Sequence, residues 1–232
     1  MHLHIPKVPH SLREFLREVG IIALAVMIAL GSEQAIEAMH WRHVIESERE
    51  SLDLGVDDVR FAMRARVAEQ PCVDRRLADL AVVFKRREHH QPLGLVAPIG
   101  RVALWLRDDT ALRIATADGS LSHMSVAEKN KYFSAFGVYQ RTFAPVAQEE
   151  RDSWRALQPL NHPEVLGDED WRALRKAYSD ALDSNMVLKS NLKNDGPGQW
   201  LKPFTFFPNP SSPVDVTAYP QVKLLCADAV TP

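Results

Sequence analysis

The chain lacks an excess of charge of either sign, an internal repeat and a recognisable catalytic motif. Its 232 residues include 28 Lys and Arg against 30 Asp and Glu, a formal net charge of −2. This balance gives no indication of nucleic-acid binding or of a polybasic membrane-binding segment. No serine lies in a Gly-x-Ser-x-Gly elbow. We therefore expect a protein that is not an enzyme, needs no cofactor and has no nucleic-acid partner.

An apolar run long enough to cross a bilayer unaided is also missing. The most apolar stretch, VGIIALAVMIALG, covers only the thirteen residues 19–31. As a helix it would extend roughly 20 Å, against a hydrocarbon core of roughly 30 Å. Apolar residues continue to Met39, and Trp41 suits a membrane interface. We therefore predict a leader over residues 1–14 and a tilted transmembrane helix over residues 15–41.

The charges that flank the apolar run predict its orientation. Lys7, Arg13 and Arg17 precede it, whereas Glu33 and Glu37 follow it before the next cation. Positive charge is retained on the cytoplasmic side of membranes. The pattern thus predicts a single-pass protein of a bacterial inner membrane, with a cytoplasmic N-terminus and a periplasmic C-terminal domain.

Two other interpretations of the apolar run remain open at this point. Ala29 and Gly31 are small residues at the positions that a signal peptidase prefers, so the run could be a cleaved signal. It could also be the core helix of a soluble protein. Residues 32–49 contain neither proline nor glycine, which favours one helix that passes through the site without cleavage.

Small residues in the predicted span indicate a contact surface. Ala25 and Ala29 are four apart, as are Gly31 and Ala35. Such pairs let membrane helices approach closely. We expect this segment to associate with other membrane protein subunits or with a second copy of the chain.

Few segments alternate as strands do, so the sequence predicts an all-α fold: the transmembrane helix continues into a periplasmic helical bundle over residues 42–194.

Pro71 is expected to end one helix and begin another, as an αα-hairpin. Pro145 is expected to kink or end a later helix that Ser125 and Glu128 open with a capping box. Seven prolines predict an irregular tail, docked on the domain, over residues 195–232. Further helices are expected at residues 102–117 and from Asp168 to about residue 192.

Only two cysteines are present, Cys72 and Cys226, and both follow the predicted span. In an oxidising periplasm such a pair can form a disulfide. The bridge would close a loop of about 150 residues and tie the tail to the start of the domain. The alternative is two unrelated buried thiols.

Glu37, His40 and His43 form the most site-like polar cluster, at spacings of three residues. A Glu-x-x-His unit supplies ligands in di-iron bundles, but there it occurs twice with further glutamates. The sequence has no second copy. We therefore interpret these residues as weak metal candidates on a polar helix face.

Four aromatic residues share one predicted helix: Tyr132, Phe133, Phe136 and Tyr139. They could line a pocket for a small ligand, although aromatic side chains at helical spacing more often pack in a core.

Residues 12–43, LREFLREVGIIALAVMIALGSEQAIEAMHWRH, resemble the start of a family of uncharacterised proteobacterial single-pass inner-membrane proteins. The shared features are the FLxEVGI motif, the ALG run and the EQ…WR helix, with a looser match at residues 72–77. The resemblance implies a membrane anchor and an exported helical domain, but no activity and no catalytic residues.

The sequence thus supports one main functional hypothesis and two others. The first is an anchored interaction protein, an accessory or scaffold subunit of a membrane complex. The second is a periplasmic sensor-like module that binds a ligand beside residues such as Tyr132 and Phe136 and acts through a partner. The third, an enzyme assisted by a metal at Glu37, His40 and His43, lacks a complete ligand set.

Overall fold

The computed structural model of the chain describes residues 12–94, 98–103, 109–192, 204, 215–216 and 218–227. The regular elements among them are α-helices and short 3-10 or π turns, with no strand in the described part. The all-α prediction is therefore confirmed. Most of the predicted Pro-rich tail lies outside the described residues, but within it Pro220–Cys226 forms a short helix, α6.

The longest element, α1, runs without interruption from Leu12 to Glu88, 77 residues. The chain divides into two compact units, Met1–Glu48 and Arg49–Pro232. The described part of the first unit consists of helix whose large apolar side chains are exposed, among them Ile22 at 63% and Ile28 at 63%. Within the described residues, α1 is the one helix that is long and apolar enough to cross a membrane, and its most apolar window is 0% buried.

Pro71 lies inside α1, so the predicted αα-hairpin is wrong. Proline in a helix interior removes one hydrogen bond and costs about 3 kcal/mol. The helix nevertheless continues because its buried face continues: Met63 and Val73 on either side of the proline are both fully buried. Between them the buried positions are Ala65 and two polar residues, Arg66 and Glu69. This polar interruption made the buried face look like two separate stripes in the sequence.

A second long helical stretch is composed of α3 (Val126–Val138), a π turn η2 (Tyr139–Phe143) and α4 (Ala144–Ala156). The predicted capping box is present, since the Ser125 hydroxyl accepts from the Glu128 amide at 3.2 Å and the Glu128 carboxylate accepts from the Ser125 amide at 3.0 Å. The Ala144 amide donates to the Tyr139 carbonyl, five residues back. This wider turn precedes Pro145, which lacks an amide proton, and the helix continues instead of ending.

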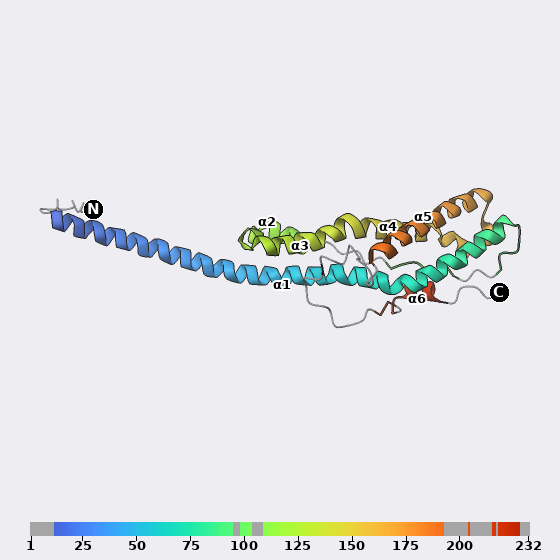
Figure 1. Ribbon diagram of the computed structural model, residues 1–232, viewed down its shortest axis with the longest axis horizontal. Helices are drawn as coiled ribbons and strands as arrows, with labels where there is room; N and C mark the ends of the chain where they lie inside the picture. The colour runs from blue at the N-terminus through green and yellow to red at the C-terminus, as the bar shows by residue number, and fades with distance from the viewer. Residues whose placement is uncertain are drawn as a thin grey trace, which may run out of the picture. The chain divides into compact units, whose positions relative to one another are not determined.

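The core of the second unit lies between α1, α4 and α5 (Asp168–Leu192), whose ribbons run alongside one another in Figure 1. Short elements connect them: α2 (Thr110–Ala117), η1 (Ser120–His123), η3 (Gln158–Asn161) and η4 (Pro163–Val165). The helix predicted from residue 102 begins only at Thr110, and residues 104–108 lie outside the described part. One buried apolar cluster contains Val73, Leu77, Leu80, Phe84, Trp154, Leu157, Leu160, Trp171, Leu174, Ala177, Ala181 and Leu225.

The continuity of α1 predicts that Pro71→Ala stabilises the protein. Alanine restores an amide donor within the helix and removes the clash of the ring with the preceding turn, for a gain of about 1–3 kcal/mol. Urea unfolding of the full chain in detergent, followed by circular dichroism, measures the change. Pro163→Ala is the control, because Pro163 begins a 3-10 turn, where an amide donor is not needed. A hairpin turn at Pro71 would instead make Pro71→Ala neutral or destabilising.

Candidate functional site

The residues predicted for helix contact in the membrane, Ala25, Ala29, Gly31 and Ala35, are all exposed on α1. At about 100° per residue, Ala25, Ala29 and Ser32 lie on one face of the helix. The Ser32 hydroxyl donates to the Ala29 carbonyl at 2.8 Å, so its polarity is satisfied within the helix. A Cβ atom added at Gly31 would meet nothing within 4 Å. Ala25, Ala29 and Ser32 therefore present small side chains on one exposed face of α1, and Gly31 lies on another face.

Glu37, His40 and His43 are exposed on the same helix. The His40 ring lies 5.8 Å from the ring of Trp41, centroid to centroid. Across the part of the chain that the structure describes, no group of three or more His, Cys, Asp and Glu side chains is placed to hold a metal ion. The structure therefore brings no further ligand to these three residues.

The four predicted aromatic residues do not share one role. Tyr132, Phe136 and Tyr139 are buried, whereas Phe133 is 46% exposed. The Tyr132 hydroxyl donates to the Asp53 carboxylate of α1 at 2.9 Å. Burial and that carboxylate together raise the pKa of the Tyr132 phenol. Phe136 packs so closely on α1 that its ring would lie 3.0 Å from a Cβ at Gly55. Tyr132 and Phe136 therefore attach α3 to α1, and Tyr139, at the start of η2, packs beside Phe143.

A buried ion pair joins α1 to α4. The Arg66 guanidinium donates Nε to one Glu150 carboxylate oxygen at 2.7 Å and Nη2 to the other at 2.6 Å. The side chains are only 3% and 1% exposed. Arg66 Nη2 also donates to the Asn185 side-chain oxygen of α5 at 2.9 Å. One guanidinium thus connects all three core helices, with the bidentate geometry that makes such pairs strong.

This centre extends toward solvent through Gln70 and Asp74. The Gln70 amide donates to the oxygen of Asn185 at 2.9 Å and to Asp74 at 2.8 Å. The Lys189 ammonium lies 2.7 Å from the other Asp74 oxygen. Burial raises the pKa of the Asp74 carboxyl, but hydrogen bonds from Lys189, Asn185 and Gln70 outweigh it and lower the pKa overall. Because each carboxylate here has a cationic or amide partner, the arrangement is suited to holding helices together, not to proton transfer.

Sequence reasoning missed this polar centre. Arg66 continues the series Leu52, Val56, Val59 and Met63 at the same helical spacing, so it occupies a core position. An arginine at a core position requires a buried partner. The helical spacing of Arg66 was the signal that the sequence offered for a buried arginine. This spacing does not identify the partner, Glu150, which is 84 residues away.

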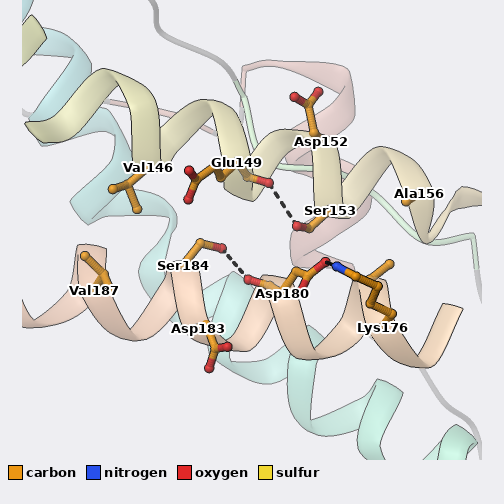
Figure 2. Close-up of a pocket in the computed structure, with 11 residues that line it drawn as sticks. Val146, Glu149, Asp152, Ser153, Ala156, Lys176, Asp180, Asp183, Ser184 and Val187 are labelled. Atoms are coloured by element: carbon orange, nitrogen blue, oxygen red, sulfur yellow. Dashed lines mark hydrogen bonds and ion pairs between the residues drawn. The ribbon is translucent and has the colours of Figure 1, made fainter. Parts of the chain in front are cut away.

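A hollow of about 620 Å³ lies between α4 and α5. Figure 2 shows the polar side chains of the two helices around it, with Ser153 and Ser184 hydrogen-bonded to backbone carbonyls of their own helices. The side chains that line the hollow include four carboxylates and one ammonium group. The ammonium belongs to Lys176 and pairs with Asp180 at 2.6 Å. The lining contains no His or Cys, and both hydroxyls are already engaged. The hollow has an acidic surface but no nucleophile with a base.

The structure brings together the two cysteines that the sequence predicts to pair, although they are 154 residues apart. The Sγ atoms of Cys72 and Cys226 lie 2.03 Å apart, the distance of a disulfide, and join α1 to α6. The Arg76 guanidinium donates Nη2 to the carbonyls of Leu224 at 2.8 Å and Ala227 at 3.1 Å. The C-terminal residues are therefore tied to α1 by covalent and polar contacts together.

No protein-family model matches this chain, and neither a curated protein nor a solved structure is significantly similar to it. Inference about its function therefore rests on its own residues.

The Arg66–Glu150 pair predicts a strong double-mutant coupling. Arg66→Met or Glu150→Leu alone leaves a buried charge without its partner and should destabilise the protein by about 3–5 kcal/mol. The double variant replaces both charges by apolar groups and should recover most of that loss. Urea unfolding of the four proteins gives the coupling energy. The exposed Lys176–Asp180 pair is the control, with a coupling below about 1 kcal/mol. Additive effects at Arg66 and Glu150 would contradict the pairing.

The lowered pKa of Asp74 predicts a specific dependence on pH. Its ionised form stabilises the fold at any pH above the unfolded value of about 3.9, and this contribution disappears as the pH falls through the lower folded pKa. Asp74→Asn should therefore be less stable than the parent protein near neutral pH, and the difference should shrink in acid. Unfolding measured from pH 7 to pH 3 tests this. A difference for Asp74→Asn that does not change with pH would oppose the assignment.

Proposed function

We propose that this chain is a single-pass, membrane-anchored helical protein that acts by binding other membrane proteins or further copies of itself, as an accessory or scaffold subunit of a membrane complex. The observation that carries the proposal is the exposed apolar stretch of α1, whose most apolar window is 0% buried. A helix surface of this kind is unfavourable in water and favourable in lipid. The resemblance of residues 12–43 to inner-membrane proteins agrees with it.

The proposed orientation places the N-terminus in the cytoplasm and residues 49–232 in the periplasm of a bacterium. Arg13 and Arg17 precede the apolar stretch, and Glu33 and Glu37 follow it, as the positive-inside rule requires. The helix passes through residues 29–31 without a break, which favours an uncleaved anchor over a signal peptide. The cysteine pair at disulfide distance agrees with an oxidising compartment.

The exposed small residues support association within the membrane. Ala25 and Ala29 leave a shallow face on which a second helix can approach closely. A short apolar run is also retained more readily in a bilayer when it associates. The sensor-like alternative has less support, because Tyr132 and Phe136, expected to line its pocket, are buried against α1.

Reporter fusions at the C-terminus test the orientation. An alkaline phosphatase fusion, active only outside the cytoplasm, should be active, and a green fluorescent protein fusion should not fluoresce. Arg13→Glu combined with Arg17→Glu should increase the inverted population, because positive charge determines the side that is retained. A fluorescent fusion to the unaltered chain would contradict the proposal.

The contact face predicts the effect of bulky substitutions. Ala25→Ile or Ala29→Ile should lower cross-linking to a partner or to a second copy in membranes by about fivefold, because the larger side chain separates the helices. Quantitative cross-linking followed by mass spectrometry measures the loss. Met27→Ile introduces the same residue on a different face and should leave cross-linking unchanged. Equal effects of all three substitutions, or a strictly monomeric protein without a co-purifying partner, would count against the contact face.

A further inference from the structure

The helix α6, Pro220–Cys226, is attached to the bundle mainly at its C-terminal end. Cys226 lies at disulfide distance from Cys72 of α1. Arg76, only 2% exposed, donates to the carbonyls of Leu224 and Ala227. Arg75 adds a longer contact, from Nη1 to the Cys226 carbonyl at 3.4 Å. The covalent bond and the polar contacts therefore act on the same few residues.

The same short helix covers apolar surface. Val222 and Leu225 are 0% and 1% exposed. Val222 packs in a small cluster with Ala65 of α1 and with Ala103. A Cβ added at Gly100 would lie 2.1 Å from the backbone nitrogen of Leu225, so the backbone of α6 lies directly on this glycine. Removing α6 would expose an apolar slot on the bundle.

The bundle itself does not depend on α6 for most of its core. In the buried cluster that contains Trp154 and Trp171, Leu225 is the one member from α6, and the other members come mainly from α1, α4, α5 and the segments that connect them. The Arg66–Glu150–Asn185 centre also lies wholly between α1, α4 and α5. A helix of seven residues, by contrast, is far below the length at which helices persist alone. The attachment of α6 therefore depends on its contacts with α1.

Both cysteines remain partly exposed to solvent. A disulfide that can be reached from water can exchange with external thiols. Arg75 and Arg76 lie three and four residues after Cys72, one helical turn along α1, and Arg75 contacts the Cys226 carbonyl. Nearby positive charge stabilises the thiolate that leaves in such an exchange. The bond that holds α6 is therefore open to a reductant without prior unfolding of the bundle.

We propose that α6 is a redox-controlled latch: reduction of the Cys72–Cys226 bond by a dithiol releases α6 and uncovers the apolar slot, while the α1–α4–α5 bundle stays folded. One thiolate of the dithiol attacks a bridge sulfur and forms a mixed disulfide, and its second thiol then displaces the remaining cysteine. The dithiol loses two electrons and two protons and becomes a disulfide, and Cys72 and Cys226 become two thiols. This inference holds whether or not the chain spans a membrane.

Hydrogen exchange of the full chain in detergent micelles, with and without dithiothreitol at neutral pH, tests the latch. Reduction should lower the protection of amides 222–226 at least about tenfold and leave peptides from α4 and α5 unchanged. Alkylation of the quenched protein, read as a mass shift of two labels, reports that both thiols have formed. The double variant Cys72→Ser, Cys226→Ser should show the reduced pattern from the start and should not respond to dithiothreitol.

Three outcomes would overturn the proposal. Unchanged protection of α6 after two labels are incorporated means that non-covalent contacts hold it. Parallel loss of protection in α4 and α5 means that the bond supports the whole bundle. Failure of dithiothreitol to reduce the bond without denaturant means that it is inaccessible. Arg76→Met separates the polar contacts from the bond: it should weaken protection of α6 further only in the reduced protein.

Discussion

The packing of α1, α4 and α5 depends on one buried guanidinium group, that of Arg66. Arg66 lies where the buried face of α1 requires an apolar residue, and its charge is compatible with the core only because Glu150 receives it through two hydrogen bonds. The side-chain oxygen of Asn185 accepts a further hydrogen bond from Arg66 Nη2, and this contact connects α5 to the pair. A buried ion pair of this kind contributes little net stability over an apolar equivalent, but it strongly disfavours any packing in which the partners are separated. It therefore determines how α4 and α5 align on α1.

The same helix that contributes Arg66 also carries the apolar stretch. In the first unit α1 exposes large apolar side chains, and in the second it buries most of them, with Leu54 and Val82 as exposed exceptions. A single helix can do both because helical hydrogen bonds are satisfied locally, whatever medium surrounds the side chains. Exposed apolar residues all round the helix favour lipid, whereas one apolar stripe favours a bundle. The proposed anchor and the first helix of the second unit are thus both parts of α1.

The polar groups of the second unit are paired with one another or with the backbone at the positions described above. Asp74 and Glu150 each have close partners, and the hydroxyls of Ser153 and Ser184 donate to the backbone. These groups stabilise helices and their packing. The surfaces that the described chain exposes include the small-residue face around Ala29 and the acidic hollow between α4 and α5, whereas α6 covers an apolar slot on the bundle.

The sequence alone determined what depends on neighbours a few residues apart: the helical class, the exposed apolar stretch and the capping box at Ser125. Such features arise from periodicity and local hydrogen bonds. Tertiary structure decided whether α1 continues through Pro71, because packing on both sides outweighs the local cost of proline. It also decided which carboxylate meets Arg66 and that Cys72 reaches Cys226, 154 residues away. Those pairings require the helices to be packed first, and no local pattern encodes the distance between them.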